Sequence, residues 1–258
     1  MTLEQYFKEH PKAAIAVSGG TDSAFLLYMA KTYGKEVSAW YFMTPFQHQQ
    51  ESEDTRRICR ELGILLHVVK DNVLNRTEIV TNDELRCYYC KKYMFSKLLE
   101  AVAEQMEGDG WELMEGTNAS DQPEGRPGYR ALKELGILSP LRACGLTKAQ
   151  IRQKSEELGL FTAWKPSNSC LATRIPQGIP ITFPLLQRVE QCEEMLRRLG
   201  GQDLRVQILK VPEGYAARIQ VPEKQMDLVM KHRQEITAFF PMYVNAVLLD
   251  LKPREGVD

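Results

Sequence analysis

The sequence predicts an α/β protein built on a parallel sheet that has helices on both faces. Apolar strand-like segments alternate with helical patterns as far as Leu158, and this alternation is typical of βαβ units. A polar, glycine-rich turn at 18–23 follows the first strand, where parallel sheets bind their ligands. Beyond Pro176 the pattern changes, which indicates a second, smaller α+β domain.

The expected elements follow from hydrophobic periodicity. Strand-like segments lie at 13–18, 36–42, 65–69, 111–115, 204–211 and 215–221, and helical patterns cover 22–33, 51–62, 74–81, 91–106, 148–158 and 185–199. Because the carboxyl ends of parallel strands meet at one edge of a sheet, the segments 18–23, 43–48 and 115–126 are expected to surround one crevice.

A proline-punctuated linker separates the two expected domains. Pro176, Pro180 and Pro184 fall between the helical patterns on either side of them. We therefore predict a large domain over 1–178 and a small α+β domain over 179–258, with a role in substrate binding or oligomerisation.

Charge and composition favour small-molecule chemistry. The chain has 33 basic and 34 acidic residues, so no electrostatic pull toward nucleic acid or an anionic membrane is expected. No apolar run reaches the roughly 20 residues of a membrane helix, and the first residues have no signal-peptide core. A cytoplasmic location is expected. Six irregularly spaced cysteines then favour thiol, metal or cluster chemistry over a disulfide framework.

The turn Ser18-Gly19-Gly20-Thr21-Asp22-Ser23 has the features of a phosphate-binding loop. Its glycines permit positive φ, and the following helix directs free N–H groups and its positive dipole end toward an anion. The chain lacks G-x-x-x-x-G-K-[ST] and G-x-G-x-x-G, so neither a Walker loop nor a dinucleotide fingerprint is indicated. The alternative is an ordinary strand-to-helix turn capped by a side chain.

Three cysteines are candidates for chemistry. Cys87 and Cys90 form a C-x-x-C pair, which fits a redox pair, half of a zinc site, two cluster ligands or chance. Cys170 lies in a polar loop with Arg174, which can lower a thiol pKa or bind phosphate; the alternative is a small buried hydrophobic residue. The cysteines expected to be structural are Cys59, Cys144 and Cys192.

The combination of motifs resembles the LarE family of ATP-dependent sulfur transferases, within the PP-loop, adenine nucleotide alpha hydrolase-like class. The turn alone marks only the PP-loop class, and the whole set is specific. The matching segments are S-G-G-T-D-S at 18–23, C-Y-Y-C-K-K at 87–92, E-G-T-N at 115–118, R-P-G at 126–128, S-C-L-A-T-R at 169–174 and L-R-V at 204–206.

The resemblance implies a reaction in two halves. Asp22 and the PP-loop are expected to hold ATP with Mg²⁺ while a carboxylate of a pyridinium mononucleotide attacks the α-phosphate, which gives an acyl adenylate and pyrophosphate. Sulfur then displaces AMP and leaves a thiocarboxylate. The product serves the nickel-pincer nucleotide cofactor of lactate racemase or a related enzyme.

The resemblance offers two sulfur sources. In one-cysteine members the equivalent of Cys170 gives up its own sulfur and becomes dehydroalanine, so the enzyme works once. This chain resembles the three-cysteine branch, in which Cys87, Cys90 and Cys170 hold an oxygen-labile 4Fe–4S cluster with one open iron. The cluster is the favoured interpretation, with Cys170 as a ligand.

By the same resemblance, the ATP-binding residues are Ser18, Gly19, Gly20, Thr21, Asp22, Ser23, Met43, Gly116 and Arg126, and the substrate-binding candidates are Asp121, Arg174, Arg205 and Arg218. Asp121 and Arg126 can equally serve turn chemistry, and Arg205 and Arg218 can be solvated. Glu193 is expected at a subunit contact or on a solvated helix face. The family also implies a homo-oligomer.

Three other functions compete with this interpretation. An amidating ligase of the NAD-synthetase type shares the adenylation half but needs no thiols. A tRNA thiolase shares both the ATP loop and the cluster, although the near-zero net charge and the lack of an aromatic RNA platform disfavour it. The non-enzymatic alternative is a nucleotide-binding module with a structural metal.

Overall fold

The computed structural model describes residues 1–122, 125–166 and 168–254. Within it the chain forms two compact units. The first contains Met1–Val73 and Glu84–Lys165, and the second contains Leu74–Asp83 and the described residues from Pro166 onward. The division into functional domains at residues 178 and 179 remains a prediction.

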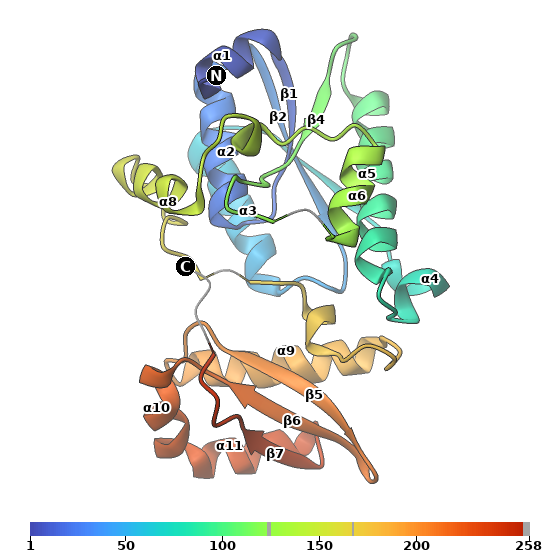
Figure 1. Cartoon of the computed structure of the whole chain (residues 1–258), viewed down its shortest axis with the longest axis vertical. Helices are drawn as coiled ribbons and strands as arrows, with labels where there is room; N and C mark the ends of the chain where they lie inside the picture. Colours follow the sequence, from blue (N-terminus) through green and yellow to red (C-terminus); the bar gives the residue numbers. More distant parts are fainter. Residues whose placement is uncertain (123–124, 167, 255–258) are drawn as a thin grey trace. The chain divides into compact units, whose positions relative to one another are not determined.

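The first unit is built on a four-stranded parallel sheet with the order β3-β2-β1-β4. Its strands are β1 (Lys12–Ala16), β2 (Glu36–Met43), β3 (Leu66–Lys70) and β4 (Glu112–Met114). The predicted parallel α/β fold is confirmed (Figure 1). Because β2 and β4 flank β1 on opposite sides, the chain reverses direction across the sheet at β1, and ligands of such sheets bind beside that point.

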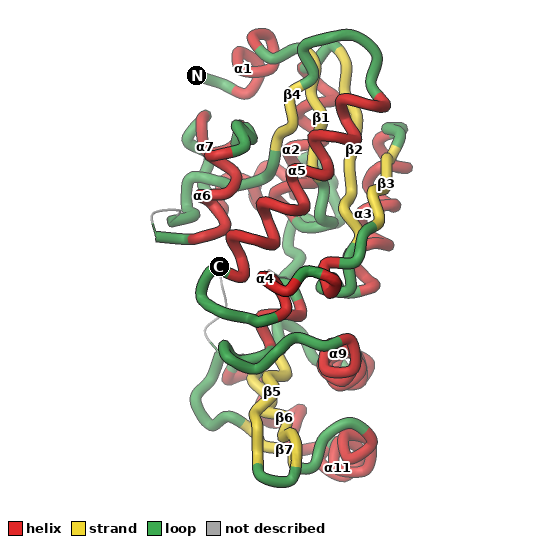
Figure 2. The backbone as a smooth tube through the Cα atoms, turned by 90° about the vertical axis from the view of Figure 1, so that its right-hand side faces the viewer, coloured by secondary structure: helices red, strands yellow, loops and turns green. Residues whose placement is uncertain are grey.

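Helices cover both faces of this sheet (Figures 1 and 2). They are α1 (Leu3–Glu9), α2 (Thr21–Tyr33), α3 (Gln49–Leu62), α5 (Arg86–Gln105), α6 (Pro127–Glu134), α7 (Pro140–Ala143) and α8 (Lys148–Glu157). Among the described residues, no helix is both long and apolar enough to cross a membrane.

Alternation along β2 assigns its side chains to two environments. Tyr41 belongs to the core cluster that includes Ile15 and the apolar residues of α2, and Met43 packs against that cluster. Trp40 and Phe42 point to the other face, where they line a cavity together with Phe95 of α5. The period-two geometry of a strand therefore separates the hydrophobic core from the candidate site.

Helix α5 begins earlier than the sequence pattern predicts. It starts at Arg86 instead of Lys91, which places the C-x-x-C pair in its first turns. Contacts with α6 stabilise this extra turn: the Tyr88 hydroxyl donates to Glu134 at 2.6 Å, and the Arg130 guanidinium lies 4.1 Å from the centre of the Tyr88 ring. These tertiary contacts leave no trace in local periodicity.

The second unit has a three-stranded sheet with the order β5-β6-β7. The hairpin predicted from alternation is confirmed, since β5 (Arg205–Val211) pairs antiparallel with β6 (Gly214–Gln220). Strand β7 (Ala246–Leu249) pairs parallel with β6. The helices of this unit are α4 (Thr77–Val80), α9 (Phe183–Arg198), α10 (Met226–Lys231) and α11 (Arg233–Phe239).

A short excursion of the chain, 74–83, belongs to the second unit. The buried Asn82 holds it there. Its Nδ2 donates to the carbonyl oxygens of Pro176 and Ile179 at 2.8 and 2.9 Å, and the Ile181 N–H donates to the Val80 oxygen at 2.8 Å. Asn82 has φ 60°, and asparagine tolerates this left-handed conformation better than most residues.

Candidate nucleotide site and cysteine loop

The two glycines of the turn after β1 have different roles. Gly19 has φ 68°, and a Cβ there would lie 2.5 Å from the Glu51 carbonyl oxygen. Gly20 is the N-cap of α2 and has no side chain to cap the helix. The first N–H groups of α2 therefore remain available to an external acceptor.

Hydrogen bonds between the serines fix the shape of the turn. The Ser18 N–H donates to Ser23 Oγ at 3.1 Å, the two serine hydroxyls are 3.1 Å apart, and Ser23 Oγ donates to the Gly20 carbonyl at 3.2 Å. Thr21 is buried and its hydroxyl donates to the Thr162 carbonyl at 2.7 Å. Thr21 thus anchors the turn to a segment far along the chain.

Lys165 also contacts the turn. Its Nζ donates to the Gly19 carbonyl oxygen at 2.8 Å and to Asp54 of α3. Because a trans peptide directs its C=O and N–H in opposite directions, this contact turns the Gly20 N–H away from Lys165. Lys165 therefore fixes the orientation of the peptide between the two glycines.

Asp22 lies in the first turn of α2 and forms an ion pair with Lys148 of α8. The distance from Asp22 Oδ2 to Lys148 Nζ is 2.7 Å. Burial raises the pKa of the Asp22 carboxyl above its ordinary value, and the Lys148 ammonium opposes that rise. Asp22 Oδ1 is buried and accepts no hydrogen bond from the described residues.

A cavity of about 310 Å³ opens beside the turn at the carboxyl ends of β1, β2 and β4. It combines apolar and polar walls, as nucleotide pockets require. Its lining includes Val17, Ser18, Gly20, Asp22, Ser23, Trp40, Phe42, Gln47, Lys91, Met94, Phe95, Leu98, Glu115, Gly116, Thr117 and Asp121. The loops after β1 and β4 therefore share one cavity, as the sequence predicts.

Gly116 and Glu115 form the wall that faces α2. A Cβ on Gly116 would lie 3.0 Å from the Ser23 nitrogen, so a larger residue here would push the start of α2 away. The buried Glu115 carboxylate accepts hydrogen bonds from the Thr117 N–H, the Thr117 hydroxyl and the Ser139 hydroxyl at 3.1, 2.8 and 2.6 Å. These hydrogen bonds let Glu115 fix the conformation of the loop after β4.

The other residues predicted from the sequence differ in whether their side chains reach the cavity. Met43 faces the core on the opposite side of β2 from the cavity. Asp121 lines the cavity and its Oδ2 accepts the Asn118 N–H at 3.0 Å. The Arg126 side chain is 64% exposed and lies 3.5 Å from Asp121; its residue precedes Pro127, the first residue of α6. The turn roles considered for Asp121 and Arg126 are therefore both present.

Cys87 and Cys90 lie in the first turns of α5, and neither forms a disulfide; Cys87 is exposed and Cys90 is half-buried. Cys90 Sγ lies 3.6 Å from Met94 Sδ, and Met94 lines the cavity. Cys170 belongs to the second unit. Among residues 1–122, 125–166 and 168–254, no three His, Cys, Asp or Glu side chains form a metal-binding group.

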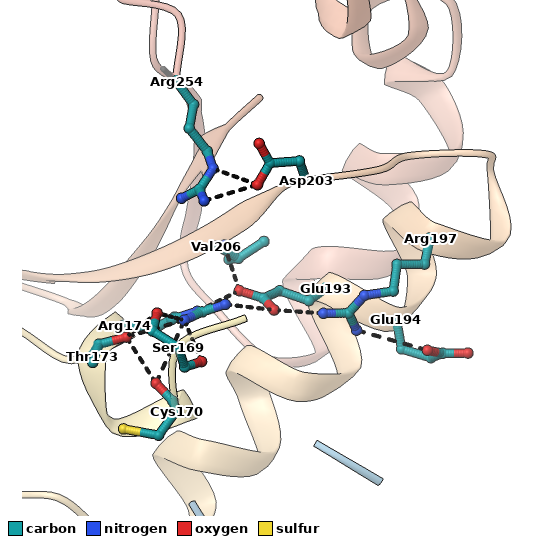
Figure 3. A network of polar contacts seen from close by, with 10 residues as sticks. All are labelled: Ser169, Cys170, Thr173, Arg174, Glu193, Glu194, Arg197, Asp203, Val206 and Arg254. Atoms are coloured by element: carbon teal, nitrogen blue, oxygen red, sulfur yellow. Dashed lines mark hydrogen bonds and ion pairs between the residues drawn. The ribbon is translucent and has the colours of Figure 1, made fainter. Parts of the chain in front are cut away.

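Figure 3 shows the loop around Cys170. The buried Arg174 guanidinium donates to the Ser169 carbonyl and hydroxyl at 2.8 and 2.6 Å, and to Thr173 Oγ1 at 3.0 Å. Its Nε contacts the Glu193 carboxylate at 2.8 Å. The Cys170 carbonyl accepts the Thr173 hydroxyl at 2.8 Å. Arg174 therefore holds the loop that carries Cys170.

Glu193 is fully buried, so the expectation of a solvated helix face is wrong. Its carboxylate also accepts the Val206 N–H at 3.0 Å and pairs with Arg197 at 2.8 Å (Figure 3). The spacing of Leu186, Val189, Glu193 and Leu196 places the glutamate on the apolar stripe of α9. This spacing is the sequence signal that identifies it as buried.

The two strand arginines differ in their surroundings. Arg205 is half-buried, and its pKa is lowered to about 10, first by burial and then by the like charges of Arg254 and Arg174. Arg218 contacts Gln207 and lies 3.7 Å from Asp250. Glu193 and Asp203 oppose that lowering through their negative charges. Among the described residues Arg205 has no ion pair of its own, whereas Arg218 already has polar neighbours.

Sequence patterns did not identify Lys148 and Lys165 as site residues. They lie 126 and 146 positions from their partners Asp22 and Gly19. Such separations leave no local pattern. The only available signal is that both lysines flank predicted loops of the sheet.

Comparison with known proteins agrees with this architecture. Residues 12–85 match the family model described as queuosine biosynthesis protein QueC. An uncharacterized protein of Synechocystis is 35% identical over 87% of this chain and 81% of its own length. The pyridinium-3,5-bisthiocarboxylic acid mononucleotide synthase of Lactiplantibacillus plantarum is 29% identical over 87% of this chain and 80% of its own.

A probable tRNA sulfurtransferase of Caldanaerobacter subterraneus is 27% identical over 72% of this chain and 50% of its own length. The parallel sheet, the S-G-G-x-D-S turn and these matches define the class as the PP-loop proteins. Within that class, the chain belongs to the LarE-like family.

Proposed function

We propose that this protein is an ATP-dependent sulfurtransferase that converts a pyridinium carboxylate mononucleotide into a thiocarboxylate. The main support is the uncapped N-terminus of α2 beside Asp22, which opens into a cavity with apolar walls. The similarity to a pyridinium-3,5-bisthiocarboxylic acid mononucleotide synthase supports the choice of substrate.

In the adenylation half, the turn binds the phosphates of ATP. The N–H groups at the start of α2 and the Ser18 hydroxyl supply donors, while the Ser23 hydroxyl holds the shape of the turn. Trp40 and Phe42 supply an apolar surface for the base. The substrate carboxylate attacks the α-phosphorus, and pyrophosphate leaves. Donors that are already oriented stabilise the charge that develops on the phosphates.

Asp22 fits a magnesium ion. Its Oδ1 is buried without a hydrogen bond from the described residues, and Mg²⁺ in nucleotide sites takes one or two carboxylates together with phosphate oxygens. When bound, the ion neutralises the phosphates and orients the leaving group.

We propose Cys87, Cys90 and Cys170 as ligands of an oxygen-labile 4Fe–4S cluster, which when bound supplies an open iron for sulfide. The two thiols on α5 have the donor chemistry that a cluster needs. The alternative route uses Cys170 alone. Its thiolate displaces AMP to form a thioester, loss of the Cα proton breaks the Cβ–S bond, and thiocarboxylate and dehydroalanine remain.

Arg205 is our candidate for the phosphate of the substrate. It is half-buried beside Arg254 and Arg174, whose ion pairs are with Asp203 and Glu193, so its own guanidinium is the one left for an anion. A guanidinium suits two-pronged contacts with phosphate oxygens.

The test begins with anaerobic purification and analysis of iron and sulfide. The protein is then incubated with ATP, Mg²⁺, sulfide and the pyridinium dicarboxylate mononucleotide, and pyrophosphate release and product mass are measured. We expect pyrophosphate and a thiocarboxylate. An amide product would instead identify an amidating ligase, and ATP binding without pyrophosphate release would identify a binding module.

Cysteine variants separate the two sulfur sources. We expect Cys87→Ser and Cys90→Ser to lose iron, and Cys144→Ser, which removes another thiol of the first unit, to keep it. Loss of the mass of hydrogen sulfide from Cys170 after one turnover would replace the cluster with the sacrificial route.

A second candidate is sulfur transfer to tRNA, which the similarity to a probable tRNA sulfurtransferase favours. The net charge of −1 weighs against it, because RNA binding needs a positive surface. Salt-sensitive binding of tRNA in a filter assay, with thiolated tRNA as product, would establish this alternative.

A further inference from the structure

Asp22 and Lys148 form a charged pair whose position is tightly fixed. Lys148 is the first residue of α8, and its N–H donates to Ser120 Oγ at 2.9 Å. The preceding Thr147 forms a capping box with Gln150, which fixes where the helix begins. The Lys148 side chain is only 13% exposed. The fold therefore holds an ammonium against Asp22 at the entrance of the phosphate turn.

Two buried polar atoms, one in this pair and one further along α8, have no hydrogen bond from the described residues. One is Asp22 Oδ1, and the other is Nε of Arg152, which follows Lys148 by one turn of α8. Arg152 also lowers the pKa of Asp22 through its charge, whereas Asp121 raises it. Such atoms are costly unless a ligand satisfies them. Asp22 thus keeps one buried carboxylate oxygen that a ligand can use.

We propose that Lys148 is a polyphosphate-binding residue that neutralises Asp22 until the Mg²⁺ complex of ATP arrives. The Mg²⁺ ion then takes the Asp22 carboxylate, and the Lys148 ammonium contacts the phosphate oxygens that enter with the ion. This inference rests on the proposed function and names the residue that receives the leaving pyrophosphate.

The exchange follows from charge. An ammonium and a divalent cation at one carboxylate repel each other, so a bare ion binds weakly while Lys148 occupies Asp22. The polyphosphate brings enough negative charge to hold both cations. Lys148 therefore disfavours the bare metal and favours the metal–nucleotide complex.

Two titrations of the full chain compare binding of the bare metal ion with binding of the metal–nucleotide complex. In the first, Mn²⁺ replaces Mg²⁺ and its binding without nucleotide is followed by electron paramagnetic resonance. In the second, binding of the Mg²⁺ complex of α,β-methylene-ATP, which cannot release pyrophosphate, is followed by calorimetry. The variants are Lys148→Met and Lys148→Arg, and the control is Lys154→Met, an exposed lysine of the same helix.

We expect Lys148→Met to bind Mn²⁺ at least about fivefold more tightly and the Mg²⁺–nucleotide complex about tenfold more weakly, the latter corresponding to the roughly 1.4 kcal/mol of a tenfold change. Lys148→Arg should restore nucleotide binding, and Lys154→Met should change neither affinity. Unchanged or weaker Mn²⁺ binding by a folded Lys148→Met protein overturns the proposal. A purely structural role would weaken both ligands together.

The proposed function can fail separately. If the two affinities move in opposite directions but no thiocarboxylate forms, the Lys148 exchange stands and the sulfur chemistry is wrong. If thiocarboxylate forms and both affinities fall together in Lys148→Met, the exchange is wrong.

Discussion

The guanidinium of Arg174 and the carboxylate of Glu193 form an ion pair 2.8 Å long inside the second unit, with exposed side-chain fractions of 1% and 0%. It joins the loop that carries Cys170 to helix α9.

Removal of one partner of this pair should destabilise the protein. We expect Arg174→Met and Glu193→Gln each to cost about 3 to 5 kcal/mol in free energy of unfolding, because the remaining charge or its hydrogen bonds are left unmatched in the interior. The double variant should lose less than the sum of the two. Urea denaturation of the four proteins measures the coupling, and additive losses would contradict it.

The two loop glycines should respond differently to alanine. At Gly19, a methyl group must fit φ 68° and a 2.5 Å approach to Glu51, so Gly19→Ala should lower the free energy of unfolding by more than about 2 kcal/mol. At Gly20, the atom nearest to an added Cβ is 3.5 Å away. Gly20→Ala should therefore change the free energy of unfolding by less than about 1 kcal/mol. Thermal denaturation compares them, and equal losses would refute the distinction.

The carboxyl of Asp22 should make stability depend on pH. Because burial raises its pKa above the ordinary 3.8, the folded state binds the proton more tightly than the unfolded state. This group therefore favours folding at low pH and loses that contribution as pH rises above 3.8 through the raised pKa. The free energy of unfolding of the wild type, measured relative to Asp22→Asn, should fall over that window. A rise would contradict the direction.

Asn82 should contribute to the stability of the second unit through the hydrogen bonds of its side chain. Asn82→Ala removes the donors to Pro176 and Ile179, and unmatched buried carbonyls should cost about 2 to 3 kcal/mol in free energy of unfolding. The exposed Asn75 provides the control, since Asn75→Ala should stay within about 0.5 kcal/mol of the wild type. Equal effects in urea denaturation would argue against the role of Asn82.

A change at Arg205 should affect the KM for the mononucleotide substrate and not the KM for ATP. We expect Arg205→Gln to raise the KM for the mononucleotide about tenfold or more, because a charge-assisted hydrogen bond contributes about 1.5 to 3 kcal/mol, and to leave the KM for ATP unchanged. Arg198→Gln is the control, since that side chain is 77% exposed. Steady-state pyrophosphate release measures both constants, and an unchanged mononucleotide KM would remove Arg205 from the site.

The fold was predictable because its elements are encoded locally. The strand from Lys12 and the turn with Gly19 have periodicity and glycine chemistry that a short window contains. The start of α5 was not predictable, because its extra turn depends on contacts of Tyr88 with α6.

The candidate site was predictable in part for the same reason. Parallel topology brings Gly116 to Asp22 without knowledge of any side-chain contact. Lys148 and Lys165 reach the turn only through tertiary packing, and Met43 requires the alternation of β2 to be assigned to the correct faces. Spatial partners more than 100 positions apart are not a property of local sequence.

The segment that Asn82 anchors also affects the order in which the chain can fold during synthesis. Its partners, Pro176 and Ile179, lie 94 and 97 positions further along. At about 5 to 20 residues per second, the ribosome needs on the order of 5 to 20 s to supply them. Until then the segment 74–83, which includes the fully buried Ile79, lacks the rest of the second unit. The nascent chain is therefore most exposed to aggregation after its nucleotide-binding turn is made and before the cysteine loop is complete.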